Sequence, residues 1–274
     1  MPFRDAWTPE KYLKRVIRCS VRAGEKPPLL PEESLEIGPG DGTLLVCDAH
    51  VSGRSDYLGY LYRDGWTGGD PPRTRWAYEG DFPMDLGEAD PDYLEEMYRR
   101  THRIPLYERT TKRCLLRETS ETDLDAFYEI YRDPSVTAYM EDLFPERERE
   151  EAYTASYREN IYEIYGFGIW TVIRRDTREI IGRAGISFRP GYEDPELGFV
   201  IGARWQKKGY AFEVCSEILT GARERGFDRV LALVQPDNAP SRALCEKLGM
   251  GPAGEVTEDG RTFVKYVFDF GAPM

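Results

Sequence analysis

The sequence predicts an α/β protein with two parts. Residues 113–274 form an α+β domain built on a mixed sheet, and residues 1–112 form a small α/β domain. Three observations lead to this prediction. Short runs alternate apolar with polar residues, as half-buried strands do, and longer stretches repeat apolar residues every three or four positions, as amphipathic helices do. Both kinds of segment follow one another through the second part of the chain. The first part is instead rich in glycine, proline and aspartate.

The first part contains short strand-like runs, at 43–48, 57–62 and 75–80. We predict a helix over 90–102, because Asp90 is a good N-cap and proline follows at the first helical position. Residues 11–22 carry basic side chains without an acid, and their apolar neighbours predict a short amphipathic helix with a solvated face. The glycine cluster at 38–42 lacks the Gly-Lys-Ser/Thr of a phosphate loop and is interpreted as a turn.

The second part opens with a strand at 115–118 and a helix at 121–131, whose apolar residues share one face. Pro145 begins a second helix. Residues 167–188 contain two strands around a polar turn, which predicts a hairpin. A further strand follows at 195–201.

After this strand, a long amphipathic helix is expected to end near Gly226, because glycine is favoured just past a helix C-terminus. The segment 228–235 is nearly all apolar in its middle, which is typical of a buried parallel strand. A helix spans 238–250 with Asn238 as its N-cap, and a final strand spans 261–270.

Composition narrows the class of function. The formal net charge of −12 disfavours DNA binding and suits cationic partners such as amines. No apolar run approaches the roughly 18 to 20 residues of a membrane helix, and the N-terminus lacks the apolar core of a signal peptide, so a cytoplasmic protein without membrane contact is expected. The five cysteines form no Cys-x-x-Cys pair and there are two histidines, so we predict reduced thiols and no metal site.

The stretch "QKKGYAFE" at 206–213 stands directly before the long helix. The first amides of a helix have no intrahelical acceptor, and the helix dipole adds positive potential there. Together they predict an anion site suited to phosphate. Gly209 allows a close approach of the backbone, and the small Ala211 leaves room for the ligand. Side chains expected to add donors are Gln206, Lys207 and Lys208.

Three blocks of sequence resemble the GNAT acetyltransferases. "ELGFVIGARWQKKGYAFEV" resembles their acetyl-CoA-binding motif, Gln/Arg-x-x-Gly-x-Gly/Ala, matched here by Gln206, Gly209 and Ala211. "NAPSRALCEKLGM" resembles the next motif, and "LLRETSETDLDAFYEIY" resembles the opening strand and first helix. The match covers about 113–272 with the blocks in order, and it is most similar to the subgroup that includes ribosomal-protein alanine N-acetyltransferases.

The resemblance implies the GNAT acyl-CoA N-acyltransferase fold, with a V-shaped sheet in which the strand at 195–201 parts from that at 229–235. The implied cosubstrate is acetyl-CoA. Its pyrophosphate would meet the amides of 206–211, and the strand at 196–201 would offer backbone groups to the pantetheine and the thioester carbonyl. The cofactor-binding residues expected on this basis are Phe199, Val200, Ile201, Gln206, Lys207, Lys208, Gly209, Tyr210, Ala211, Asn238 and Ser241.

Acetyl transfer to an amine needs a base for the amine proton, donors for the carbonyl oxygen and a proton for the departing thiolate. By resemblance, Glu196 is the expected base, directly or through a water; the alternative is a strand carboxylate in a local ion pair. Glu193 and Asp194 are weaker alternatives. Asn238 is expected to bond the pantetheine arm, although capping its helix competes with that role. Ser241 would lie near the sulfur of CoA, or be a helix hydroxyl without function.

Many members of the family carry a tyrosine as general acid in this last helix, and Cys245 stands at that place. The thiol could donate a proton, but a small packed residue is the favoured interpretation, with Ser241 or a water as the donor. Glu141 and Asp142 fall between the first two helices, where the family binds its acceptor. They are expected to hold a cationic amine; the alternative is a pair of exposed loop acids.

The first part loosely resembles a haloacid-dehalogenase-like unit, because a strand ends in Asp48. That family needs Asp-x-Asp, and His50 replaces the second aspartate, so no phosphatase activity is predicted. A Rossmann-like remnant that covers the catalytic domain or aids a homodimer contact is expected.

The leading hypothesis is an acetyl-CoA-dependent N-acetyltransferase acting on a protein N-terminus, a polyamine or another small amine. A non-catalytic acyl-CoA-binding module is the alternative, suggested by the missing tyrosine and the appended domain. Acetylation of a charged RNA is disfavoured by the net charge.

Overall fold

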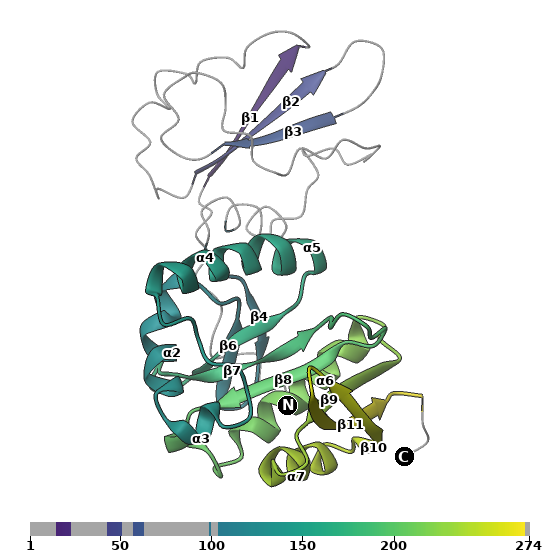
Figure 1. Ribbon diagram of the computed structural model, residues 1–274. Helices are drawn as coiled ribbons and strands as arrows, with labels where there is room; N and C mark the ends of the chain where they lie inside the picture. The colour runs from purple at the N-terminus through teal and green to yellow at the C-terminus, as the bar shows by residue number, and fades with distance from the viewer. Residues whose placement is uncertain (1–14, 23–42, 51–56, 63–98, 100–103, 272–274) are drawn as a thin grey trace. The chain divides into compact units, whose positions relative to one another are not determined.

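The computed structural model divides the chain into two compact units, Met1–Leu106 and Tyr107–Met274 (Figure 1). It describes residues 15–22, 43–50, 57–62, 99 and 104–271. Among these residues, no helix is long and apolar enough to cross a membrane.

The described part of the first unit is a three-stranded sheet in the order β1-β2-β3. β1 (Arg15–Arg22) runs parallel to β2 (Thr43–His50), and β2 runs antiparallel to β3 (Tyr57–Tyr62). The strands predicted at 43–48 and 57–62 are thereby confirmed. The glycine cluster at 38–42, the strand predicted at 75–80 and the helix predicted over 90–102 lie outside the described residues, apart from Arg99, which is helical.

The helix predicted over 11–22 is wrong in its described portion, which is the strand β1. Its apolar residues Ile17, Cys19 and Val21 alternate with polar ones, which is the period of a strand. Valine and isoleucine also favour strands because their branched side chains restrict rotation in a helix. Pairing with β2 along the whole strand decides between the two patterns.

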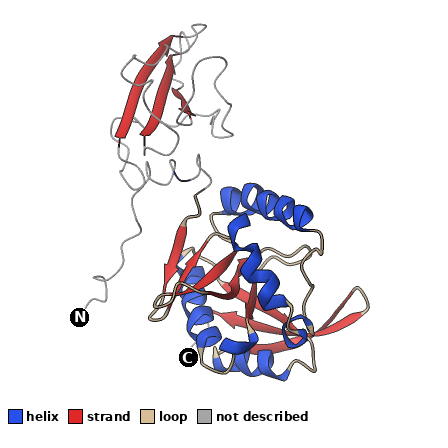
Figure 2. Ribbon diagram, turned by 90° about the vertical axis from the view of Figure 1, so that its left-hand side faces the viewer, coloured by secondary structure: helices blue, strands red, loops and turns tan. Residues whose placement is uncertain are grey.

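Within the described residues, the second unit holds an eight-stranded sheet in the order β10-β11-β9-β8-β7-β6-β5-β4 (Figure 2). Its neighbouring strands are antiparallel, except that β8 and β9 are parallel. The strands are β4 (Tyr107–Thr110), β5 (Cys114–Arg117), β6 (Ile169–Arg174), β7 (Ile180–Ser187), β8 (Glu196–Ile201), β9 (Arg229–Val234), β10 (Gly251–Glu258) and β11 (Arg261–Asp269).

Helices cover this sheet. They are α2 (Leu124–Tyr131), α3 (Pro134–Thr137), α4 (Arg147–Tyr157), α5 (Glu163–Tyr165), α6 (Tyr210–Glu224) and α7 (Ala239–Lys247), and a π-helical turn (Arg158–Tyr162) joins α4 to α5. α2 packs against β7, and α6 packs against β7 and β8. The mixed sheet and the helices predicted around 121–131, before Gly226 and over 238–250 are confirmed.

The sequence analysis missed the two edge strands, β4 and β10. β10 contains two glycines and a proline, has a register shift between Pro252 and Glu255, and is largely exposed, so it has neither the apolar run nor the clean alternation of an inner strand. Proline is tolerated in a sheet at such an edge. β4 pairs with β5, so the sheet begins at Tyr107, ahead of the expected boundary at 113.

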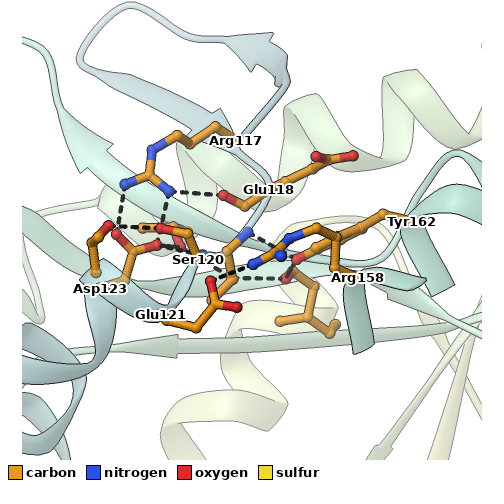
Figure 3. Close-up of polar contacts among 11 residues, drawn as sticks. Arg117, Glu118, Ser120, Glu121, Asp123, Arg158 and Tyr162 are labelled. Carbon is orange, nitrogen blue, oxygen red and sulfur yellow. Dashed lines mark hydrogen bonds and ion pairs between the residues drawn. The ribbon is translucent and has the colours of Figure 1, made fainter. Parts of the chain in front are cut away.

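A buried carboxylate joins the start of α2 to the sheet (Figure 3). Asp123 is 1% exposed and accepts two hydrogen bonds from the guanidinium of Arg117, at 2.8 and 2.6 Å. It also accepts from the backbone N–H of Ser120 at 3.0 Å and from the hydroxyl of Thr171 on β6 at 2.8 Å. Every oxygen is therefore satisfied, and β5, β6 and α2 are tied at one point.

We expect Asp123→Asn to lower the free energy of unfolding by about 2 kcal/mol, because an amide removes the counter-charge of Arg117 and turns an acceptor into a donor. Urea denaturation at pH 7 measures the loss. Asp125→Asn is the matched control: Asp125 is exposed and pairs with Arg147 at the surface, where such pairs contribute within about 1 kcal/mol. Equal losses in the two variants would contradict the proposed importance of the buried carboxylate.

Candidate active site

The sheet splits between β8 and β9. These parallel strands have a single register pair, Glu196↔Leu231, beside which the Leu231 N–H donates to the carbonyl of Pro195 at 2.9 Å. On its other side β8 pairs with β7 along its whole length. The expected V-shaped opening between these two strands is therefore present, and it widens towards the C-terminal end of β8.

The backbone of β8 lines this opening. The N–H of Gly202 donates to Ile181 of β7 at 2.9 Å, whereas the carbonyl of Pro195 faces β9. Because backbone groups alternate in direction along a strand, those of Phe199 and Ile201 are directed into the split. The Ile201 carbonyl accepts a hydrogen bond from the Gln206 side chain, which leaves Phe199 as the residue whose N–H and C=O line the middle of the opening.

The turn between β8 and α6 presents backbone amides. Lys207 and Gly209 both have positive φ, 57° and 80°, so the chain turns sharply just before the helix. The N–H of Glu213 donates to the carbonyl of Gly209 at 3.1 Å and begins the helical ladder. The amides ahead of it have no intrahelical acceptor and carry the positive end of the helix dipole. They belong to Tyr210, Ala211 and Phe212.

Two side chains expected to bind phosphate instead brace the turn itself. Gln206 Nε2 donates to the Ile201 carbonyl at 2.9 Å, and Lys208 Nζ donates to the Arg204 carbonyl at 2.7 Å. The first bond joins the turn to the end of β8, and the second joins two residues within the turn. Together they stabilise its conformation. Lys207 is exposed and stays the side-chain donor predicted for a phosphate.

Arg113 was not identified from the sequence, yet it lies beside this turn. Its Nε donates to Glu213 at 2.6 Å, its Nη1 donates to the Lys208 carbonyl at 3.0 Å, and its guanidinium stacks 4.3 Å from the Tyr210 ring centroid. It thus fixes the turn to the start of β5 and adds a positive charge there. Arg113 and Glu213 are far apart in sequence and belong to no shared motif, so only pairing in the fold reveals them.

Glu196 lies where β8 and β9 diverge. Its carboxylate accepts from Arg189 Nη1 at 3.0 Å and from the backbone N–H of Leu233 on β9. Burial raises the pKa of Glu196 and Arg189 lowers it, with a net increase above the ordinary value. Glu196 therefore forms the local ion pair that was the alternative to a role as base. Its raised pKa nevertheless suits a base near neutral pH. Glu196 as the base stays a prediction.

The ion pair extends away from the split. Arg189 also binds Glu258 at 2.6 Å, and the Tyr192 hydroxyl donates to Glu258 at 2.6 Å. Of the two weaker alternatives to Glu196, Asp194 pairs with Arg229 at 3.3 Å and Glu193 is exposed.

The helix after β9 starts with the expected cap. The side-chain oxygen of Asn238 accepts from the Ser241 N–H at 3.2 Å, which leaves its amide nitrogen for a ligand. Ser241 is partly exposed. Cys245, in contrast, is 0% exposed and belongs to the core, and burial raises the pKa of its thiol to about 11. Its candidacy as a catalytic acid is corrected: the thiol packs in the core, away from solvent, as the favoured interpretation had it.

Glu141 and Asp142 are exposed in the segment between α3 and α4. Just before them, Tyr139 contacts the loop that follows β9: its hydroxyl donates to the Asp237 carbonyl at 3.3 Å, and Gln235 Nε2 donates to the Tyr139 carbonyl at 3.2 Å. These contacts place the two acids near the C-terminal end of β9, where the sheet is open. Among the described residues, no group of three or more His, Cys, Asp or Glu side chains could hold a metal ion.

Comparisons with known proteins agree with this geometry. The model of the acetyltransferase (GNAT) domain matches residues 113–251. YnaD of Bacillus subtilis (strain 168), named an uncharacterized N-acetyltransferase, is 33% identical over 147 residues, which are 53% of this chain and 83% of the relative. The [ribosomal protein uS5]-alanine N-acetyltransferase of Escherichia coli (strain K12) is 25% identical over 170 residues, 58% of this chain and 85% of that enzyme.

A solved structure shows the same fold. Mycobacterium smegmatis RimJ in complex with CoA-disulfide superposes with a TM-score of 0.50 at 16% identity, covering 61% of this chain and 90% of that one.

Proposed function

Because the chain belongs to the GNAT acetyltransferase family, whose members use acetyl-CoA, we propose that it transfers the acetyl group of acetyl-CoA to a primary amine by direct attack of the amine on the thioester. The observation that carries this proposal is the parting of β8 from β9 directly before the braced turn at Gly209. This arrangement places an opening that can hold a thin, extended ligand arm beside β8, and an anion site at the C-terminal end of β8.

The elements of this site would divide the cosubstrate between them. The pyrophosphate lies against the amides of Tyr210, Ala211 and Phe212, with Lys207 as a side-chain donor. The pantetheine arm extends along β8 and exchanges hydrogen bonds with the Phe199 backbone, as an added strand would. A backbone N–H in this opening also stabilises negative charge on the thioester oxygen in the transition state.

The chemistry requires two proton movements. Glu196, directly or through a water, removes a proton from the incoming ammonium, and the neutral amine attacks the thioester carbon. A C–N bond forms and the C–S bond breaks, and the proton that the attacking nitrogen still carries in excess passes, by way of Ser241 or a water, to the CoA thiolate. No covalent enzyme intermediate is needed, since placement of the two reactants supplies much of the rate.

The acceptor site is proposed beside Glu196, where the amine meets the thioester, and Glu141 and Asp142 attract the cationic amine as it approaches. One relative is named for an alanine of a ribosomal protein, which supports a protein N-terminus as one acceptor class and small amines as the other.

A thermal-shift titration with acetyl-CoA and CoA, followed by thiol release over a panel of amines, tests the proposal. We expect both nucleotides to raise the melting temperature, because they bind the folded chain alone, and at least one amine to release CoA. Binding without turnover on any amine would instead support a non-catalytic acyl-CoA-binding module. No shift with either nucleotide would contradict the cofactor site.

A further inference from the structure

Ile169, at the start of β6, is held by two tyrosines. Its backbone N–H donates to the Tyr157 hydroxyl at 3.0 Å, and its carbonyl accepts a hydrogen bond from the Tyr162 hydroxyl. Tyr157 ends α4 and Tyr162 ends the π-helical turn, and their rings lie edge to face with centroids 5.2 Å apart. A π-helical turn links residues five apart, which brings both phenols to the same residue of β6. The two bonds fix the backbone of Ile169.

The side chain of Ile169 extends across the sheet towards β8. The register pairs Ile169 with Gly185 on β7, and Gly185 with Gly198 on β8. The space over Gly185 is full, because a Cβ there would lie 1.9 Å from the carbonyl oxygen of Gly168. The Cδ1 atom of Ile169 lies 3.2 Å from a Cβ built on Gly198. The end of this side chain therefore stands over β8.

The fold leaves room for a side chain at position 198. Apart from Cδ1 of Ile169 and the chain neighbours of Gly198, no atom of the described residues lies within 4 Å of a Cβ built there. Both residues are partly exposed, so solvent reaches them. We call this volume the open position at Gly198. Ile169 bounds it on the side of β6 and β7.

This boundary cannot withdraw. The branch at Cβ of an isoleucine restricts rotation about χ1, and the two tyrosine hydroxyls fix the backbone of Ile169. The carbonyl of Gly168 fills the space over Gly185, which the side chain would need in order to move back. Small shifts of Cδ1 about χ2 are the freedom that is left.

The open position at Gly198 lies beside the proposed base. Glu196 and Gly198 are two residues apart on β8, so they face the same side of the sheet. The register pairs Glu196 with Leu231. Two residues further along β9, Leu233 shares this face across the split; its N–H donates to the Glu196 carboxylate, and its side chain is partly exposed. The proposed base and two apolar side chains thus surround the open position.

We propose that Ile169 determines acceptor specificity, by limiting the size of the group carried on the carbon next to the reacting amine. This inference rests on the proposed function. The amine must come within hydrogen-bond reach of Glu196, directly or through one water, and must face the thioester in the split. Its neighbouring carbon then lies beside Gly198, with a substituent directed into the open position. Hydrogen or a small apolar group fits there, whereas a branched group meets Cδ1 of Ile169.

The first test enlarges the open position by one methyl group. Ile169→Val removes Cδ1, the atom that bounds it, and keeps the branch at Cβ. The amides of glycine, alanine and valine, which differ in the group next to the amine, are compared in the thiol-release assay. We expect the wild type to prefer alaninamide to valinamide, and Ile169→Val to raise the kcat/KM for valinamide relative to alaninamide on the order of tenfold. A ratio that stays at the wild-type value would overturn the proposal.

Ile164→Val is the matched control. It makes the same substitution at an exposed isoleucine of α5, close to Ile169 in the sequence. We expect it to keep the wild-type ratio of the two amides. An equal change of the ratio in both variants would show that contact at the open position is not the cause, and would contradict the proposal.

The second test fills the open position. Gly198→Ala adds a methyl group whose one close neighbour outside β8 is Cδ1 of Ile169, the end of a side chain that can shift slightly. We expect this variant to lower kcat/KM for alaninamide relative to glycinamide on the order of tenfold, and the double variant with Ile169→Val to recover part of the loss. Equal losses for the two amides would count against the inference, because they would show a general disturbance of β8.

A binding measurement separates this inference from the proposed function. Absence of turnover on every amine would contradict the proposed function. Thermal shift of the CoA-bound protein with valinamide then decides the role of Ile169. A larger shift for Ile169→Val than for the wild type would support it, since a ligand that binds only the folded chain raises the melting temperature in proportion to its affinity. Equal shifts, or no shift in either protein, would overturn it.

Discussion

Replacing Gly209 with alanine is expected to weaken acetyl-CoA binding and to lower kcat/KM on the order of a hundredfold, because small displacements of positioning groups have effects of this size. Gly209 has φ of 80°, a conformation in which a Cβ is strained. A Cβ there would meet no closer protein atom than Arg113 Nη2, at 3.5 Å, so the protein itself would accommodate it. We expect the methyl group to hinder the approach of the pyrophosphate to the amides that follow Gly209.

Gly226 provides a matched control at the other end of the same helix. Its φ is 83°, and a Cβ built on it has no neighbour within 4 Å. Gly226→Ala should therefore lose a similar stability from backbone strain and keep its affinity for acetyl-CoA. Calorimetric titration of acetyl-CoA and urea denaturation of both variants separate strain from ligand contact. Equal affinities in the two variants would show that the turn at Gly209 does not bind the cosubstrate.

Replacing Glu196 with glutamine is expected to lower kcat by about 10² to 10⁴, the range that a positioned base contributes. The affinity for acetyl-CoA should stay nearly constant, because glutamine has the same size and the anion site lies at the far end of β8. Steady-state kinetics with the best amine from the panel measure the first effect, and thermal shift with CoA checks the second.

The pH dependence gives a sharper test of the same residue. Burial, opposed by Arg189, leaves the pKa of Glu196 above its ordinary value. Since a base acts when deprotonated, wild-type kcat/KM should rise with pH through this raised pKa and fall on its acid side. The Glu196→Gln variant has no such group, so its acid limb should flatten.

Glu258→Gln is the control for the ion pair. Glu258 shares Arg189 with Glu196 but lies on β10, away from the split. If the carboxylate of Glu196 served only to balance Arg189, the two substitutions would have similar effects on turnover. We expect Glu258→Gln to keep kcat within a few-fold of the wild type and to retain the acid limb.

Periodic apolar patterns and helix caps were enough to predict most of the larger sheet and its helices. The patterns are strong there because the strands β5 to β9 are largely buried on both faces and each long helix is buried on one. The same rules failed at 11–22, where basic residues suggested a helix and pairing with Thr43–His50 makes a strand. They also missed the edge strands, whose exposure removes the apolar signal.

The anion site could be read from local sequence, because a glycine before a helix and the first amides of that helix are neighbours in the chain. The roles of side chains could not. Gln206 and Lys208 were predicted as phosphate donors, and only the structure shows which backbone carbonyls their side chains bind. Cys245 was favoured as a packed residue, and its burial agrees with that interpretation.

Residues close together in the sequence thus determined which segments of the larger sheet and its helices are strands or helices, and also the turn at Gly209. The reason is that helix and strand propensity, helix capping and the spacing of apolar residues all act over a few residues. Packing between segments distant in the sequence determined the opening between β8 and β9, the bond of Arg113 to Glu213 and the raised pKa of Glu196. The reason is physical. The pKa of a side chain depends on its burial and on the charges around it. Those neighbours come from segments that are far apart in the sequence and meet only in the folded protein.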